Sequence, residues 1–413
     1  MGSLLADFRR FARERRLEAS CFLVGGSVRA ILSGAKEPKD IDIAMRGNAI
    51  RAARGFAAQA GGTFVPLDER FGMARVVRAD GRLDLARLRG RTIGEDLLKR
   101  DITINAMAFP LSSRRLIDPL GGAKDLMDGI VRIVSEGNLI DDPLRILRCY
   151  RFSAAGGFRL EVATAASLKR LTSLLTRPAP ERITEEVKKI LASQGAARTL
   201  ERMMKDGALR TILPGLRAKN LLALKAMKRV CGRLRFPRRS RLQPEERAAI
   251  ELAVLVSGKG GGRLVLSRRE RRLLERLDFS RGRLSRLFRR GAGRAALTGM
   301  LADAGDEISA HLLYTCAFFA AEGEEEGERF LEFSRGLLSL YVKTVRPRLQ
   351  AMPVNGDDLK KEFYLLPSPL FKTVLEGVRA KWLLGQVRDR REALSAAKKI
   401  IQGENRQVKR EKH

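Results

Sequence analysis

Two aspartates separated by one residue, Asp40 and Asp42, are the side chains of this sequence best suited to hold a metal ion. On a β-strand, side chains alternate, so both carboxylates would point to one face while Ile41 and Ile43 enter the core. Two carboxylates held this close repel each other unless a cation lies between them. Mg²⁺ prefers hard oxygen ligands and retains positions for substrate phosphates, so it is the expected occupant. Taken alone, the pair fits a solvated edge strand equally well.

A glycine pair upstream of these aspartates favours the metal site. Gly25-Gly26-Ser27 follows an apolar run, Cys21 to Val24, that is typical of a buried strand, and it opens a helical segment. The glycines allow a tight turn with outward N–H groups, Ser27 can contribute a hydroxyl, and the helix N-terminus with Arg29 favours anions. Strand, loop, helix and aspartate pair together predict a triphosphate cradle facing a metal pair. No GK[ST] follows, so the loop is not a P-loop.

Four motifs in this order resemble those of the class II tRNA nucleotidyltransferases and bacterial poly(A) polymerases of the polymerase-β superfamily. The family pattern is GG-x-VRD, D-x-D, RRDFT-x-NA and EDxxRxxRxxRF. The matching segments are Gly25 to Ala30 (GGSVRA), Asp40 to Asp42 (DID), Lys99 to Ala106 (KRDITINA) and Asp141 to Phe152 (DDPLRILRCYRF). Three positions depart from the pattern: Ala30 replaces an acid, Lys99 an Arg and Asp141 a Glu.

The resemblance implies a role for each matching residue. Asp40, Asp42 and, on a later strand, Asp84 would be the catalytic residues and would hold two Mg²⁺ ions, one lowering the pKa of the RNA 3′-hydroxyl and one bridging the triphosphate. Asp142 and Arg145 would act as an amino-acid template that reads the Watson–Crick edge of the incoming CTP or ATP. The full nucleotide-binding set is Gly25, Gly26, Ser27, Arg29, Arg100, Asp101, Asn105, Asp142, Arg145, Arg148 and Arg151, in which Arg100, Asp101 and Asn105 would meet the triphosphate and ribose.

Two of these assignments have simpler readings that stay open. Asp84 also fits an ordinary acid of a β-hairpin. Asp142 and Arg145 are three residues apart, which on a helix places them on one face. However, Asp142 followed by Pro143 is also a good helix start, with an N-cap residue and Pro at the first helical position.

Short β-like runs alternate with helical segments up to about residue 135, and these elements would position the site. We expect strands at 21–24, 41–44, 63–65, 73–78 and 82–86, a hairpin turn at 79–81 and a helix at 49–60. Beyond about residue 140 helical periodicity runs to the C-terminus, including 144–152, 163–175, 181–192 and 197–209, with interruptions at 178–180, 237–244 and 257–262.

These elements and the resemblance predict an α+β fold: a polymerase-β-like nucleotidyltransferase head, with a mixed or antiparallel sheet and helices, followed by an all-α neck, body and tail. The expected domains are a catalytic head at 1–137 and a helical neck for base recognition at 138–210. A basic helical body at 211–345 and a helical tail at 346–413 would bind RNA.

The charge balance favours a polyanionic partner. The 413 residues include 81 Lys and Arg against 48 Asp and Glu, a formal net charge of +33, and contacts to phosphates release condensed counterions. No apolar run approaches the roughly 20 residues that span a bilayer. The amphipathic N-terminus has no secretory signal, so cytoplasmic RNA is favoured over a membrane. Basic clusters at 225–241, 263–276 and 281–294 contain few aromatics, which suits an A-form duplex such as the tRNA acceptor end and TΨC arm.

Scattered cysteines and two histidines leave little room for other chemistry. Four cysteines without CxxC pairing indicate neither a zinc site nor a disulfide framework. Two histidines exclude a histidine-based metal centre or catalytic triad. No obligate protein partner is evident, and the oligomeric state is open.

The activity within the family depends on the stretch between the D-x-D and RRD motifs. CCA-adding relatives carry a flexible loop there that helps the switch from C to A. Here the chain runs from Asp84 through 87–91 almost directly into Glu95, which looks shortened, as in CC-adding members. We therefore expect CC addition, with A addition, full CCA addition and poly(A) polymerisation as alternatives. A non-enzymatic RNA-binding protein with a decayed polymerase head is a further alternative, supported by Ala30 and opposed by the intact aspartates.

Overall fold

The computed structural model describes residues 3–35, 38, 40–113, 115–234, 236, 241–258 and 262–410, with side chains up to residue 403. It contains two compact units. The first comprises Met1–Pro214 with Gly262–Val265, and the second comprises Gly215–Gly261 with Leu266–His413. The finer division into head, neck, body and tail stays a prediction. Parts of the basic cluster at 225–241 and of the interruptions at 237–244 and 257–262 lie outside the described residues.

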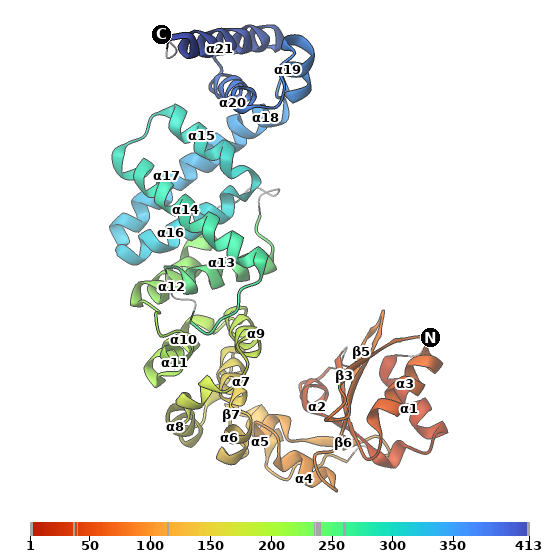
Figure 1. Cartoon of the computed structure of the whole chain (residues 1–413). Helices are drawn as coiled ribbons and strands as arrows, with labels where there is room; N and C mark the ends of the chain where they lie inside the picture. Colours follow the sequence, from red (N-terminus) through yellow and green to blue (C-terminus); the bar gives the residue numbers. More distant parts are fainter. Residues whose placement is uncertain are drawn as a thin grey trace. The chain divides into compact units, whose positions relative to one another are not determined.

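A six-stranded sheet forms the N-terminal part of the first unit (Figure 1). The strand order is β3-β4-β5-β2-β1-β6. Only the β2–β5 pair is parallel, so the sheet is mixed, as expected. The expected strands and the turn between β4 and β5 are confirmed. The strands are β1 (Cys21–Val24), β2 (Asp40–Met45), β3 (Thr63–Asp68), β4 (Met73–Arg78), β5 (Gly81–Arg87) and β6 (Ala108–Pro110).

Helices α1 (Leu4–Glu14) and α3 (Ala49–Ala60) pack on one face of this sheet (Figure 1). Phe8 and Phe11 of α1 meet Phe56 of α3, with ring centroids 5.2 and 5.5 Å from that of Phe56. Ile41 and Ile43 of β2 are buried in the same core. Because side chains alternate along a strand, the aspartates on either side of Ile41 point to the opposite face.

The rest of the first unit is mainly helical. A short parallel pair, β7 (Ile130–Val131) and β8 (Arg159–Leu160), supplements the helices. The segment expected as one helix at 197–209 is divided at Gly207, whose φ of +93° ends α10. The helices are α2 (Gly25–Leu32), α4 (Ile93–Leu98), α5 (Gly122–Met127), α6 (Glu136–Asp141), α7 (Leu144–Ala154), α8 (Val162–Arg170), α9 (Pro180–Leu191), α10 (Ala196–Asp206) and α11 (Ala208–Ile212).

Gly262–Val265 belongs to the first unit although residues on both sides of it belong to the second. The Arg263 N–H donates to the Ile212 carbonyl (2.9 Å). The Val265 N–H donates to the Thr184 hydroxyl (2.8 Å), which is buried in α9. The segment is therefore bonded to the last helices of the first unit.

All regular secondary structure in the described residues of the second unit is helical. Phe319 and Phe330 stack in its core with centroids 4.1 Å apart. The side-chain amide of Asn220 donates to three carbonyls at the end of α13, at 3.0 to 3.1 Å. In the part of the chain that the structure describes, no helix is long and apolar enough to cross a membrane. The helices are α12 (Ala218–Arg233), α13 (Pro244–Val256), α14 (Arg268–Arg290), α15 (Arg294–Ala304), α16 (Ile308–Glu322), α17 (Glu324–Leu340), α18 (Arg346–Gln350), α19 (Gly356–Phe363), α20 (Pro369–Leu384) and α21 (Arg390–Arg410).

Candidate active site

The glycine loop between β1 and α2 is bonded directly to the strand that carries the aspartate pair. The Gly26 N–H donates to Asp42 Oδ2 (3.0 Å). The buried Ser27 hydroxyl donates to the Asp40 carbonyl (3.1 Å) and accepts the Asp42 N–H (2.7 Å). A Cβ at Gly25 or Gly26 would lie 3.3 or 3.1 Å from Asp42 Oδ2, and Gly25 has a φ of +59°. Gly25 therefore has a backbone conformation that other residues rarely adopt, and a side chain at Gly26 would require the Asp42 carboxylate to shift by a few tenths of an ångström.

The three expected metal-binding aspartates lie on the two parallel strands of the sheet. Asp42 of β2 is in register with Asp84 of β5. Burial raises the pKa of the Asp42 carboxyl, an effect that the Gly26 N–H opposes and Asp84 reinforces. Asp40 is the most exposed of the three, with 62 % of its side chain accessible.

Two arginines pair with two of these carboxylates. Asp84 accepts both Nε and Nη2 of Arg75 (2.7 and 2.8 Å). Asp40 forms the same two-point contact with Arg82 (2.7 and 2.8 Å). Among the described residues, no group of three or more His, Cys, Asp or Glu side chains is gathered as a metal site. The hard oxygens of the aspartates, carried on one sheet face, nevertheless have the chemistry that Mg²⁺ requires.

The RRD-like motif after α4 orients a second set of polar groups. Asp96 of α4 accepts Nε and Nη2 of Arg100 (3.0 and 2.9 Å). Asp101 is buried, and its Oδ1 accepts the side-chain amide of Asn105 (2.8 Å). The other amide atom, Asn105 Oδ1, is buried without a partner among the described residues. An orphaned acceptor beside the loop suits a donor from a ligand, such as a ribose hydroxyl.

Asp101 also links this motif to α7. Its Oδ2 accepts Nε of Arg148 (2.7 Å), and its Oδ1 accepts the Ile102 N–H (3.0 Å). Burial alone would raise the pKa of Asp101, but Arg148 and the hydrogen bonds from Asn105 and Ile102 lower it to about 2. Arg148 thus has a buried, ionised partner.

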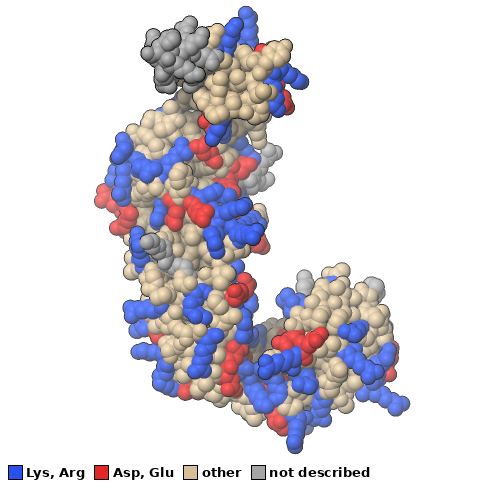
Figure 2. Space-filling model, viewed as in Figure 1, with Lys and Arg blue, Asp and Glu red and all other residues tan. Residues whose placement is uncertain are grey.

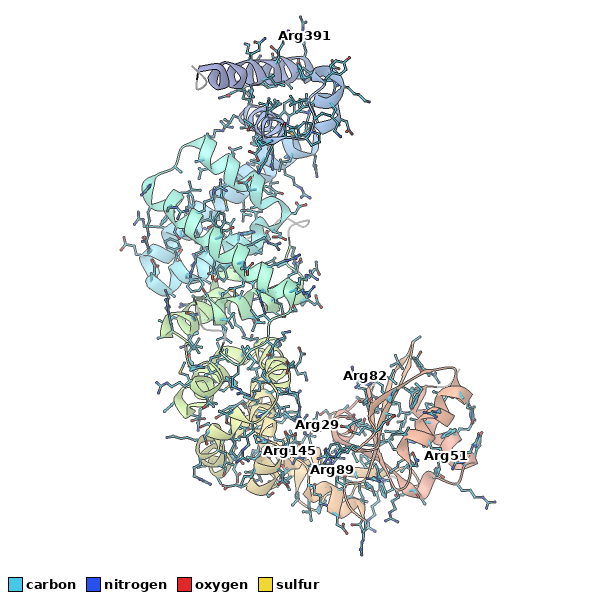
Figure 3. All side chains as sticks on the ribbon, in the orientation of Figure 1. Arg29, Arg51, Arg82, Arg89, Arg145 and Arg391 are labelled. Carbon is cyan, nitrogen blue, oxygen red and sulfur yellow. The ribbon has the colours of Figure 1, made fainter. Side chains whose placement is uncertain are left out.

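The expected base-reading pair lies at the start of α7. Asp142 precedes the helix in an extended conformation and accepts the Leu144 N–H (3.3 Å). A helix does start here, but Pro143 rather than Asp142 is its N-cap residue, and Asp142 lies outside the helix whose face it was expected to share with Arg145. Its other oxygen accepts Nη2 of Arg182 (3.2 Å). Arg145, labelled in Figure 3, is 9 % exposed and donates to the Lys99 carbonyl (2.9 Å). Burial lowers the pKa of Arg145, yet an arginine in a protein stays protonated.

Two arginines from different helices share one aromatic ring. The guanidinium carbons of Arg29 (Figure 3) and Arg151 lie 4.9 and 4.6 Å from the ring centroid of Phe152. Burial lowers the pKa of both arginines. Arg151 also forms an ion pair with Glu186 (2.8 Å) without hydrogen-bond geometry between the two atoms. These contacts join α2 to α7 beside the loop.

The connection between β5 and α4 is short and internally bonded. It comprises residues 88–92. The Arg89 N–H donates to Asp96 Oδ1 (2.9 Å), and the Arg91 N–H donates to Glu95 Oε2 (2.9 Å). The first turn of α4 therefore holds the backbone that leads into it.

Several residues of this site were not predicted from the sequence. Asp96 could have been found, because it lies four residues before Arg100 at helical spacing. Arg75 and Arg82 had no local signal, because only the pairing of strands places them beside the aspartates. Phe152 stood in the last motif without an assigned role.

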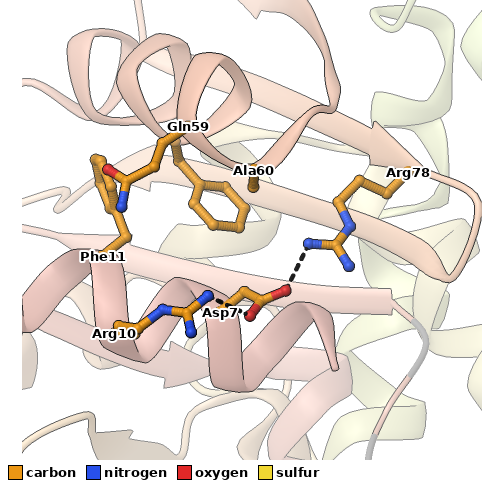
Figure 4. Close-up of a pocket in the computed structure, with 7 residues that line it drawn as sticks. Asp7, Arg10, Phe11, Gln59, Ala60 and Arg78 are labelled. Atoms are coloured by element: carbon orange, nitrogen blue, oxygen red, sulfur yellow. Dashed lines mark hydrogen bonds and ion pairs between the residues drawn. The ribbon is translucent and has the colours of Figure 1, made fainter. Parts of the chain in front are cut away.

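A cavity of about 320 Å³ lies away from these residues, between α1, α3 and β4 (Figure 4). Asp7 lies between Arg10 and Arg78 at its edge, at 2.9 and 2.8 Å. None of its lining residues belongs to the expected nucleotide-binding set: Asp7, Arg10, Phe11, Phe56, Gln59, Ala60 and Arg78.

Basic side chains cover much of the face shown in Figure 2. Some arginines of α14 are paired, as Arg276 is with Glu307 (3.0 Å) and Arg283 with Asp303 (2.6 Å). The basic clusters that the sequence predicted to bind RNA therefore include arginines that form ion pairs with neighbouring elements of the second unit.

Comparison with known proteins gives consistent matches to this chain. Residues 21–132 match the family model "Poly A polymerase head domain", and residues 157–219 match "Probable RNA and SrmB- binding site of polymerase A". CC-adding tRNA nucleotidyltransferases of Geobacter sulfurreducens and Synechocystis are 34 % and 30 % identical, over 90 % and 92 % of this chain and 90 % and 93 % of theirs. An A-adding tRNA nucleotidyltransferase of Halalkalibacterium halodurans is 29 % identical, over 94 % of this chain and 90 % of its own.

Solved structures agree along most of the chain. A CCA-adding enzyme in its apo form superposes with a TM-score of 0.73 at 26 % identity, covering 95 % of this chain and 92 % of its own. The Thermotoga maritima CCA-adding enzyme complexed with tRNA gives a TM-score of 0.69 at 25 % identity, covering 97 % and 94 %. The expected α+β head with helical remainder is thereby confirmed.

Proposed function

The chain belongs to the class II tRNA nucleotidyltransferase family, and we propose that within this family it adds CMP to tRNA 3′ ends without a nucleic-acid template, stopping after CC. The substrates are CTP and a tRNA that lacks its CCA end, and the product besides the extended RNA is pyrophosphate. The tRNA acceptor end and TΨC arm are the proposed partner surface. The family relationship supports the reaction class, and the specificity rests on the geometry below.

In this reaction Asp40, Asp42 and Asp84 hold two Mg²⁺ ions, which supply charge neutralisation for the triphosphate and a lowered pKa for the attacking 3′-hydroxyl. Ser27 positions the strand that carries the aspartates, because its hydroxyl bonds the backbone at both Asp40 and Asp42. The N–H groups of the glycine loop and the start of α2 bind phosphate oxygens. Arg100, oriented by Asp96, adds a fixed charge to that cradle.

Nucleotide choice is assigned to Asp142 and Arg145. Arg145 presents paired donors, which suit O2 and N3 of cytosine, and Asp142 presents acceptors for its exocyclic amine. The Lys99 carbonyl fixes the guanidinium of Arg145. Asp142 can leave its Arg182 partner more easily, because the Arg182 side chain is 56 % exposed. Asn105 Oδ1, buried and unpaired in the described structure, is assigned to the ribose.

The short connection at 88–92 is the observation that carries CC specificity. A switch from C to A requires this region to change its conformation, as the flexible loop of CCA-adding relatives allows. Here Asp96 and Glu95 each hold a backbone N–H of the connection at 2.9 Å. Asp96 is also the partner of Arg100, so movement of the connection would disturb the triphosphate cradle. A connection bonded in this way supports one binding mode for the base.

The decisive assay incubates the protein and Mg²⁺ with tRNAs ending at the discriminator base, at C and at CC, each with CTP, ATP or both. CC addition predicts that the first two substrates are extended to CC with CTP alone and that ATP adds nothing to any of them. Extension of a CC-ended tRNA with ATP would identify an A-adding or CCA-adding enzyme. Long A tails on unrelated RNAs would identify a poly(A) polymerase.

The Asp40→Ala variant separates an enzyme from an RNA-binding protein with a decayed head. We expect it to lose nucleotide incorporation and to bind tRNA as the unaltered protein does. If the unaltered protein is inert with Mg²⁺, CTP, ATP and all three tRNAs, the enzymatic proposal is wrong.

A further inference from the structure

Two guanidinium groups lie among the three aspartates of the candidate metal site. Arg75 of β4 is opposite Asp84 of β5, which is opposite Asp42 of β2. One step along the same face, Arg82 of β5 is opposite Asp40 of β2. Three carboxylates on one face repel one another, and the arginines compensate two of these charges.

The two pairs differ in how easily a cation could replace the arginine. The side chains of Arg82 and Asp40 are 50 % and 62 % exposed, whereas those of Arg75 and Asp84 are 31 % and 26 % exposed. An exposed ion pair contributes little net stability, because water screens it and both long side chains lose freedom. The Arg82–Asp40 pair is therefore the one that separates at small cost.

We propose that Arg82 is a positioning residue that holds Asp40 when no metal is bound and competes with the metal for that carboxylate. The inference rests on the proposed metal role of Asp40 and Asp42. Both oxygens of Asp40 are engaged by Arg82, so neither is free to coordinate a cation until the guanidinium moves. The backbone of Asp40 stays fixed by Ser27 during this exchange, and only side chains need to rotate.

Removal of Arg82 should tighten metal binding. The Arg82→Gln variant frees Asp40 and removes a positive charge next to the incoming divalent cation. Both effects act in the same direction, and together they correspond to a roughly five- to tenfold lower dissociation constant at low salt. The Arg82→Lys variant keeps the charge but loses the two-point contact, so its dissociation constant should lie between those of Arg82→Gln and the unaltered protein.

The test measures Mn²⁺ binding to the full chain without nucleotide or RNA, from the electron paramagnetic resonance signal of free Mn²⁺. Arg51→Gln is the matched control, because Arg51 is an exposed arginine of α3, which packs on the opposite face of the sheet. This control should change the dissociation constant less than twofold. In an Asp40→Ala background, Arg82→Gln should lose its effect, apart from the roughly two- to threefold contribution of the charge itself.

Unchanged or weaker Mn²⁺ binding by Arg82→Gln overturns the inference, as does an equal gain in Arg51→Gln. If Arg82→Gln does not fold, the Arg82→Lys arm decides by the same criterion, with a two- to threefold gain expected. Because no nucleotide is present, the result is independent of CC addition. A protein that binds Mn²⁺ as expected but extends no tRNA would refute the proposed activity and leave this inference standing.

Discussion

The ion pair between the partly exposed Arg148 and the buried Asp101 allows a sharp test of how the first unit is held together. Asp101 is 5 % exposed and accepts three hydrogen bonds, of which only the one from Arg148 carries a charge. In an Arg148→Met variant, a methionine replaces the guanidinium while most of the apolar stem is kept. The carboxylate then remains buried with two neutral donors, the Ile102 N–H and the Asn105 amide.

The magnitude follows from the pKa of Asp101. A pKa of about 2, against an ordinary value of 3.8, corresponds to about 2 kcal/mol of stability at neutral pH. Removal of one partner of a fully buried pair costs about 3–5 kcal/mol, and the 37 % exposure of the Arg148 side chain places this pair at the lower end of that range. We therefore expect a loss of about 3 kcal/mol, or roughly 6–12 °C in the midpoint of thermal unfolding for a unit of this size.

The same pair sets the pH dependence. Because the pKa of Asp101 is lower in the folded state than in the unfolded state, the stabilisation that the pair contributes is complete above about pH 5 and is lost as the pH falls from about 4 towards 2. In Arg148→Met the pKa of Asp101 rises, so this variant no longer loses that contribution. The gap in stability between the two proteins should therefore narrow by about 1 kcal/mol between pH 7 and pH 3.

Thermal unfolding by differential scanning calorimetry between pH 7 and pH 3 measures both effects. Arg182→Met is the control, because Arg182 pairs with the partly exposed Asp142 and is itself 56 % exposed. The Arg182→Met variant should lose less than about 1 kcal/mol of stability, and its difference in stability from the unaltered protein should not narrow comparably at low pH. A gap for Arg148→Met that stays constant with pH, or that is no larger than that of Arg182→Met, would refute the reasoning.

Three further outcomes follow from the contacts described. Gly26→Ala puts a Cβ 3.1 Å from Asp42 Oδ2, and a displacement of this carboxylate by a few tenths of an ångström should lower kcat for CMP incorporation about tenfold. A steady-state kcat within twofold of that of the unaltered protein would contradict the close approach. Arg145→Met should raise KM for CTP at least tenfold in the same assay, because it removes the paired donors of the base-reading site, and an unchanged KM would exclude that role. Asn220→Leu leaves three carbonyls at the end of α13 without their donor and should lower the free energy of unfolding by about 2–4 kcal/mol. Urea unfolding of the full chain measures this loss. An unchanged urea midpoint would show that the Asn220 amide does not stabilise the end of α13.

Local chemistry made the strands and the loop predictable. The alternation of Asp40, Ile41, Asp42 and Ile43 specifies which face each side chain takes, whatever the neighbouring strands are. The glycine pair predicted a tight turn, which is also a local property, because glycine readily adopts a positive φ such as the +59° of Gly25. Helix boundaries marked by caps, such as the start of α3 after Asn48, were equally local.

Contacts between distant segments were not predictable from patterns. Arg82 lies 42 residues from Asp40, and their bond depends on the parallel register of β2 and β5. The position of Asp142 illustrates a different limit. Spacing suggested a helix face shared with Arg145, but α7 begins at Leu144 with Pro143 as its N-cap, so Asp142 lies before the helix. Proline is tolerated at a helix start and not in a helix interior.

The return of Gly262–Val265 to the first unit has a consequence for the order in which the chain is made and folded. Synthesis runs from the N-terminus, and domains generally fold as they emerge. When Pro214 has emerged, the buried Thr184 hydroxyl still lacks the Val265 N–H, and the Ile212 carbonyl lacks that of Arg263. The first unit is completed only after about fifty residues of the second have been synthesised. A gene truncated at Pro214 would therefore encode a unit that lacks its last segment, and fragments for separate study should extend through residue 265.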